Sequence, residues 1–235
     1  MSEESDFCFR IARQPGFSLT RGLFVLCPIC NKRKPGRFCP AKAEKICAVC
    51  CGTEREVTID CPSDCGYLVS AHRYEEQHPR ALAVGTPLLD VRITSDTVEL
   101  HGRFLSAVAF TIAKFCSSQP IANDADVLAA LRSLAETYKT LTSGIVYEQP
   151  PAIPVQRELY DALSAFLTEI KQQSTAASVH PPKEAEIFQL LVFLFRMGLL
   201  RTNGRPRSRK FIEFLRGQFP GAPELQREDS RIIVP

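Results

Sequence analysis

Eight cysteines are concentrated between residues 27 and 65 of a 235-residue chain, and they are the side chains best suited to chemistry. Cysteines form disulfides, act as nucleophiles or redox groups, or hold metal ions, and their spacing helps to distinguish these uses. The clustered residues are Cys27, Cys30, Cys39, Cys47, Cys50, Cys51, Cys61 and Cys65, whereas Cys8 and Cys116 lie outside the cluster.

Two of the cysteine pairs have the spacing of a zinc-binding turn. In Cys27-Pro28-Ile29-Cys30 and Cys47-Ala48-Val49-Cys50, two intervening residues allow both sulfurs to occupy adjacent corners of one tetrahedral site. Cys61 and Cys65 are four residues apart, which predicts both sulfurs on one face of a helix that begins near Pro62. We therefore predict that the cluster binds zinc.

The rest of the chain favours metal binding over disulfides. The first residues are acidic and carry no apolar core, so they do not have the pattern of a secretory signal. The most apolar runs, 104–113 and 187–195, have at most ten residues, and a helix needs about 20 to cross a bilayer. We expect a cytoplasmic protein without membrane contact, in a reducing compartment where clustered thiols are more often ligands than disulfides.

The order of the spacings resembles that of the HIT-type and MYND-type zinc fingers. Cys27 and Cys30 match the first ligand pair of these fingers, Cys39 begins the second, Cys47 with Cys50 or Cys51 matches the third, and Cys61 with Cys65 matches the fourth. Lys42 departs from the pattern, because the family has a cysteine at that position. The resemblance implies a small cross-brace or treble-clef-like module with two zinc ions, which serves for docking or assembly.

In such a cross-brace, the first and third pairs share one ion and the second and fourth pairs share the other. The adjacent Cys50 and Cys51 can compensate for Lys42 if each of them serves a different ion. The two sites would then be Cys27, Cys30, Cys47, Cys50 and Cys39, Cys51, Cys61, Cys65. A zinc ion with four thiolate ligands has no open position for a substrate, so we expect structural ions and no enzymatic activity. His72 is expected to be a surface histidine rather than a ligand.

Two basic clusters open an alternative function. The net charge of the chain is only +3. Local clusters of lysine and arginine can nevertheless bind the phosphates of RNA or DNA. The first consists of Lys32, Arg33, Lys34 and Arg37, followed by Lys42 and Lys45, and the second of Arg201, Arg205, Arg207, Arg209, Lys210 and Arg216.

Beyond about residue 100 the apolar residues recur with helical spacing, which predicts an all-α bundle of about five helices. The predicted stripes span about 104–115, 124–141, 159–170, 184–200 and 208–216, and Asn123 and Asp124 are suitable N-caps for the second. The expected organisation is a flexible leader at 1–21, a zinc-binding module at 22–80, a connector with a possible hairpin at 81–95, a helical domain at 96–218 and a tail at 219–235.

These observations predict a non-enzymatic zinc-binding protein that acts as an interaction or assembly adaptor through its zinc module. The partner would be an unidentified protein. The alternative is direct RNA or DNA binding through the basic residues of 32–45 and 201–216.

Overall fold

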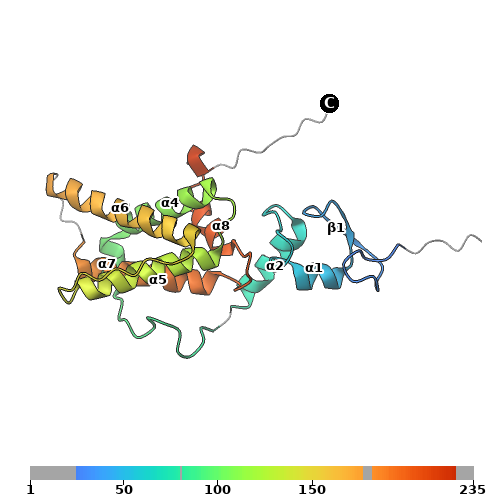
Figure 1. Cartoon of the computed structure of the whole chain (residues 1–235), viewed down its shortest axis with the longest axis horizontal. Coiled ribbons are helices and arrows are strands. Elements are labelled where there is room, and N and C mark those ends of the chain that lie inside the picture. Colours follow the sequence, from blue (N-terminus) through green and yellow to red (C-terminus); the bar gives the residue numbers. More distant parts are fainter. Residues whose placement is uncertain (1–24, 80, 177–181, 226–235) are drawn as a thin grey trace, which may run out of the picture.

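The computed structural model describes residues 25–79, 81–176 and 182–225. Over these residues the chain forms a small cysteine-rich part, residues 25–79, and a larger helical part, residues 95–217, which lie at opposite ends of an elongated molecule (Figure 1). We call them the cysteine module and the helical domain. The predicted leader lies outside the described residues.

The cysteine module begins with a short antiparallel hairpin. Strands β1 (Arg37–Cys39) and β2 (Glu44–Ile46) pair with Cys39 opposite Glu44, and a four-residue turn joins them. Helix α1 (Ala48–Glu54) follows directly, and helix α2 (Gly66–Gln77) leads toward the helical domain. The hairpin and the start of α1 therefore bring distant cysteines into one small volume.

Helix α2 begins later than its sequence suggests. Cys65 is its N-cap, and the backbone N–H of Cys65 donates to the carbonyl of Pro62 at 3.0 Å, which closes a turn ahead of the helix. Cys61 precedes that turn. The prediction that Cys61 and Cys65 share one helical face is wrong, because Pro62 lies in a turn rather than in the first turn of the helix.

The helical domain consists of α3 (Ser95–Leu100), α4 (Gly102–Ser118), α5 (Asp124–Leu141), α6 (Pro154–Ala176), α7 (Glu184–Arg201) and α8 (Lys210–Gly217). Helices α5 and α7 pack along each other, while α4 and α6 cover them (Figure 1). Asn123 caps α5, as predicted, by accepting from the backbone N–H groups of Ala125 and Asp126. A 3-10 turn, η1 (Pro223–Leu225), packs back on α4.

The connector contains no strand among residues 81–94, so the expected hairpin is wrong. Thr94 instead caps α3, because its hydroxyl accepts from the backbone N–H of Thr97 at 3.3 Å. The connector is held on the helical domain by the guanidinium of Arg196, which donates to the carbonyls of Leu88 and Val91.

Buried side chains form two separate cores. The core of the helical domain is made of leucine, isoleucine, valine, alanine and aromatic side chains from α4 to α8, with Leu88 and Leu225 added from outside. The core of the cysteine module consists of Cys27, Cys39, Ile46, Cys47, Cys50 and Ile59. Four of the six residues in this core are cysteines, so thiols make up most of the buried interior there.

Candidate metal centre

Four cysteines reach one centre from two backbone turns. Cys27 and Cys30 flank a turn that closes when the backbone N–H of Asn31 donates to the carbonyl of Cys27 at 2.8 Å. Cys47 is the N-cap of α1, and Cys50 lies in the first turn of that helix. Each predicted zinc-binding turn therefore presents its two sulfurs on the same side.

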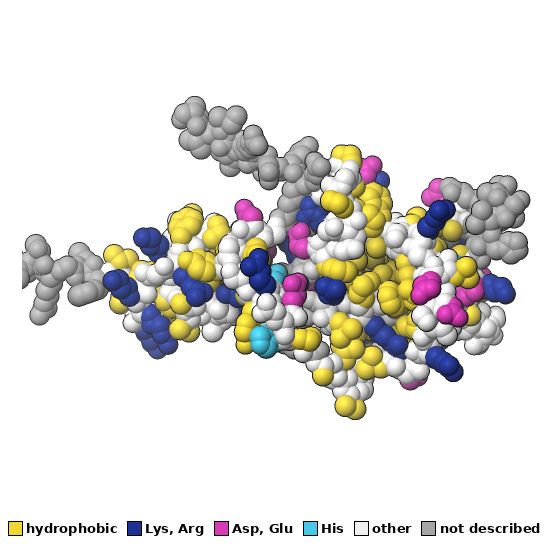
Figure 2. All heavy atoms as spheres, turned by 180° about the vertical axis from the view of Figure 1, so that it is seen from behind, with side chains coloured by type: hydrophobic (Ala, Val, Ile, Leu, Met, Phe, Trp, Pro, Cys, Tyr) yellow, Lys and Arg dark blue, Asp and Glu magenta, His cyan; other side chains and the backbone are white. Residues whose placement is uncertain are grey.

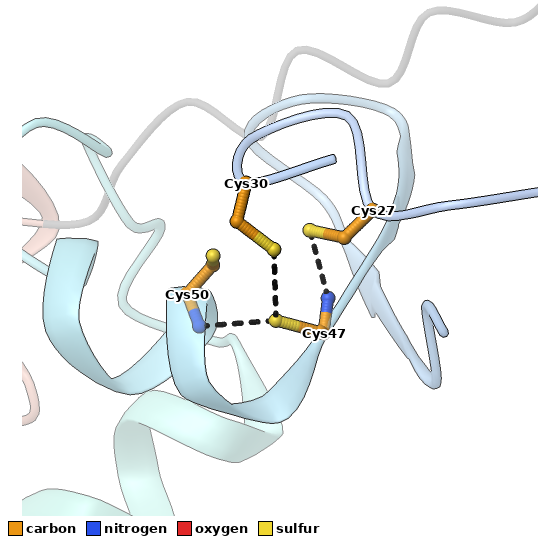
Figure 3. A group of neighbouring side chains, drawn as sticks. All are labelled: Cys27, Cys30, Cys47 and Cys50. Carbon is orange, nitrogen blue, oxygen red and sulfur yellow. Dashed lines mark hydrogen bonds between the residues drawn. The ribbon is translucent and has the colours of Figure 1, made fainter. Parts of the chain in front are cut away.

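The geometry of the four sulfurs suits a tetrahedral metal ion. All four lie within 4.8 Å of one another, and the sulfurs of Cys30 and Cys47 are 3.9 Å apart (Figure 3). Zinc–sulfur bonds of about 2.3 Å in a tetrahedron place the sulfurs about 3.8 Å apart. Cys27, Cys47 and Cys50 are at most 5% exposed. A small contraction would close this group around one ion. All nine described cysteines are free thiols, so no disulfide competes for these sulfurs.

The protein environment gives these thiols different pKa values. The backbone N–H of Lys32, helped by that of Arg33, lowers the pKa of Cys30 to about 6. Burial opposes the ionisation of Cys27, yet N–H groups led by that of Cys47 lower its pKa overall. Burial and the neighbouring thiols raise the pKa of Cys50 to about 12. Full ionisation of the group therefore requires a bound cation, as expected for a thiolate metal site.

The remaining four cysteines lie close by but do not form an equally tight group within the described chain. Cys39 ends β1, Cys51 lies beside Cys50 in α1, and Cys61 and Cys65 flank the turn before α2. Burial raises the pKa of Cys61, and the charges of Cys65, Glu56 and Cys39 raise it further. Cys51 accepts from the guanidinium of Arg37 at 3.7 Å. A second ion at this position stays a prediction.

Lys42, the residue that departs from the zinc-finger pattern, is exposed in the turn between β1 and β2. Its backbone N–H donates to the carbonyl of Cys39 at 3.2 Å, so the residue shapes the turn that follows this cysteine.

The first basic cluster is exposed. Lys32, Arg33, Lys34, Lys42 and Lys45 have no ion-pair partner among the described residues. Arg37 differs from them, because its guanidinium lies 4.7 Å from the centre of the Tyr67 ring and joins β1 to α2.

The second basic cluster is engaged within the molecule. Arg205 donates to the carbonyls of Gly52 and Arg55, and Lys210 donates to the Glu75 carboxylate at 3.3 Å and to the carbonyl of His72. The other basic side chains pair with Asp60 (Arg207 and Arg209), lie over the ring of Phe214 (Arg201) or contact Glu213 and the carbonyl of Leu225 (Arg216). Most of these contacts tie the loop before α8 to the cysteine module.

Sequence reasoning missed Glu56, which is central to this junction. Glu56 is 2% exposed, and its carboxylate accepts from Asn203 at 2.7 Å and lies 3.2 Å from Nε2 of His72. Its carbonyl accepts from the backbone N–H of Arg207 at 2.9 Å. The expected surface histidine is thus half-buried at a contact between the two parts. No sequence signal marked Glu56, because its partners are far away in the chain.

The chain matches no protein-family model, and neither a curated protein nor a solved structure matches it. In the part of the chain that the structure describes, no helix has both the length and the apolar character that a membrane span requires.

Proposed function

We propose that the cysteine module is a structural zinc-binding unit and that the chain acts through it as a non-catalytic interaction or assembly adaptor. The observation that carries the proposal is the group of four sulfurs from Cys27, Cys30, Cys47 and Cys50, all within 4.8 Å of one another. Four thiolates complete the coordination of zinc and leave no position for a reacting water, which is the arrangement of structural rather than catalytic sites.

The donor set favours zinc among the metals. Thiolates are soft ligands, and four of them in a tetrahedral arrangement select zinc or an iron centre over magnesium, calcium or manganese. The burial of the site adds a reason for a structural role, because a core with only Ile46 and Ile59 beside its cysteines has little other apolar material to stabilise it.

The proposal includes a second ion held by Cys39, Cys51, Cys61 and Cys65. The charges of Cys39 and Cys65 act on Cys61, and Cys39, Cys51 and Cys61 belong to the core of the cysteine module or pack against it, which supports this part of the proposal. The metal content decides this part: we expect two zinc ions per purified chain by elemental analysis, and less than one would refute both sites.

The adaptor role is supported by the exterior of the module. Large apolar side chains of the module are exposed: Phe38 is 56% exposed, Val49 is 47% exposed and Tyr74 is 62% exposed. Basic and hydrophobic side chains lie next to one another over its surface (Figure 2). Exposed apolar side chains beside polar ones are typical of surfaces that bind other proteins.

Direct binding of RNA or DNA is the second candidate, and the unpaired charges of residues 32–45 favour it. The residues of 201–216 contribute less to this candidate than their sequence suggests, because their charges are directed at the cysteine module and the helical domain.

Affinity capture from the native cell with and without nuclease tests the two candidates. We expect wild-type protein to retain protein partners after nuclease treatment and the Cys47→Ser variant to lose them. Partners that disappear with the nucleic acid, together with steeply salt-dependent binding to RNA or DNA in vitro, would support the second candidate instead.

A further inference from the structure

A groove of about 560 Å³ lies on the cysteine module between the chain segments 25–28, 34–35 and 44–45. The cysteine module occupies the end of the molecule opposite to the helical domain (Figure 1). Its apolar lining includes Leu26, which is 46% exposed, and Val25, which is 73% exposed. The residues that line it are Val25, Leu26, Pro28, Lys34, Pro35, Glu44 and Lys45. The groove thus combines an aliphatic and proline surface with two lysines and one glutamate.

The charge around the groove is not balanced within the described chain. Residues 31–46 contain six basic side chains and one acidic side chain, Glu44, which gives 6 − 1 = +5. Neither Lys34 nor Lys45 has an ion-pair partner among the described residues. In the second basic cluster, by contrast, Arg207, Arg209 and Lys210 have carboxylate partners on the cysteine module. The unbalanced charge therefore marks the groove as a surface for an acidic partner.

We propose that this groove binds a short peptide segment of a partner protein in which aspartate or glutamate flanks an aliphatic side chain. The inference rests on the proposed adaptor function and specifies its partner. The aliphatic side chain would lie against Leu26 and the two prolines, while the acidic groups would face Lys34 and Lys45. The lining favours a peptide over nucleic acid, because it contains no aromatic ring on which a base could stack.

The metal centre holds both walls of the groove. Leu26 precedes the ligand Cys27, whose backbone N–H donates to the carbonyl of Arg33 at 2.8 Å. On the other wall, the backbone N–H of Gly36 donates to the carbonyl of Ile46 at 3.0 Å, directly before the ligand Cys47. A groove held in this way is formed before its ligand arrives, which reduces the entropic cost of binding. Removal of the metal should therefore abolish the binding of the peptide.

Fluorescence anisotropy on the full-length, zinc-loaded protein tests the proposal. The probes are short labelled peptides with leucine at the centre and flanking aspartates and glutamates, and matched peptides with asparagine and glutamine instead. We expect the acidic peptides to bind at least about tenfold more tightly than the neutral ones, because two lysines face the flanking positions. A labelled single-stranded RNA of the same charge serves as the competing class of ligand.

Three variants sharpen the test. Lys34→Glu combined with Lys45→Glu should weaken the binding of the acidic peptide by about tenfold or more. Glu44→Gln should strengthen this binding by about twofold, because it removes the acidic side chain from the groove. Arg103→Glu combined with Arg132→Glu is the matched control, because these exposed helical residues change the net charge by the same amount far from the groove. Zinc content and circular dichroism establish that each variant is folded.

Equal binding of neutral and acidic peptides, an equal effect of the control pair, or binding of RNA without binding of any acidic peptide would overturn the proposal. A failure of the groove proposal can be distinguished from a failure of the adaptor function. If wild-type protein captures nuclease-resistant partners that the Lys34→Glu and Lys45→Glu pair still binds, the adaptor function holds and the groove is not its binding site.

Discussion

The cysteine module and the helical domain differ in what holds them together. The core around the cysteines contains only Ile46 and Ile59 beside them, and Leu68 is the one other buried apolar side chain among the described residues of the module, whereas the helical domain buries a continuous leucine-rich core. A core of two isoleucines removes too little apolar surface from water to offset the conformational entropy of some fifty residues. With the proposed zinc site, the comparison indicates two sources of stability in one chain, metal coordination at one end and apolar burial at the other.

The largest expected effect concerns the metal. Chelation of zinc, or Cys47→Ser, should unfold the cysteine module and leave most of the helical circular dichroism signal, because structural zinc contributes on the order of 10 kcal/mol to such modules. Hydrogen exchange measured by mass spectrometry should show lost protection in β1, β2 and α1. Cys116→Ser is the control, because this thiol lies in the helical core and should leave the metal content unchanged. Simultaneous collapse of both parts would contradict two separate sources of stability.

A truncation in the helical core should have the opposite pattern. Leu190, on α7, is fully buried, and Leu190→Ala should lower the free energy of unfolding of the helical domain by about 2–5 kcal/mol because it leaves a cavity. Denaturant unfolding followed at a helical wavelength measures this loss, and the zinc content should stay the same. Leu200→Ala, at a side chain 55% exposed on the same helix, should cost less than about 0.5 kcal/mol. Equal losses for the two variants would contradict the assigned core.

Close packing between helices offers a smaller test. A Cβ atom at Gly198 would lie 2.7 Å from Cδ2 of Leu128 and 2.8 Å from the ring of Phe211. Gly198→Ala should therefore destabilise the helical domain by about 1–3 kcal/mol through overpacking, despite the better helix propensity of alanine. Gly217→Ala, where a Cβ meets no atom within 4 Å, is the matched control. A stabilising Gly198→Ala would show that α5, α7 and α8 are less tightly packed.

The most local effect concerns the junction between the two parts. Burial raises the pKa of Glu56, but the hydrogen bond and charge of His72, with Asn203 and Arg205, outweigh burial and lower it overall. A carboxyl group whose pKa is lowered by folding stabilises the folded state above its ordinary pKa, and this contribution disappears as the pH falls through the lowered value. The contact should therefore hold at neutral pH and weaken under acid conditions.

Glu56→Gln tests this junction at constant pH. It should cost about 1–3 kcal/mol in local stability, because it removes the charge from a buried hydrogen-bonded group. Faster hydrogen exchange at the amides of Ile59 and Arg207 would report the loss, while Glu76→Gln on the exposed side of α2 should change nothing. In acid, wild-type exchange should approach that of the variant. If Glu56→Gln leaves the exchange at both amides unchanged at neutral pH, the carboxylate does not stabilise the junction.

Local chemistry made much of the architecture predictable, and long-range contacts explain the errors. Asn123 and the apolar stripe after it predicted α5 well, because a cap and its helix are neighbours in sequence. The third stripe was predicted from about residue 159, but α6 already begins at Pro154, whose missing N–H costs nothing in the first turn of a helix. Helix α8 starts two residues later than predicted. Its first N–H groups, those of Phe211 and Ile212, are capped by the buried carboxylate of Asp124 from a different helix.

The sequence by itself determined that Cys27 with Cys30 and Cys47 with Cys50 have the spacing of a zinc-binding turn, because this spacing is a property of a few adjacent residues. Only the tertiary structure decided which turns meet, and it brought the sulfurs of Cys30 and Cys47 to 3.9 Å. It also separated two basic clusters that look alike in sequence, because Asp60 and Glu75 pair with Arg207, Arg209 and Lys210 of one of them, whereas no ion pair joins a described carboxylate to the other. Charge compensation depends on which distant groups the fold brings within a few ångströms, and composition does not contain that information.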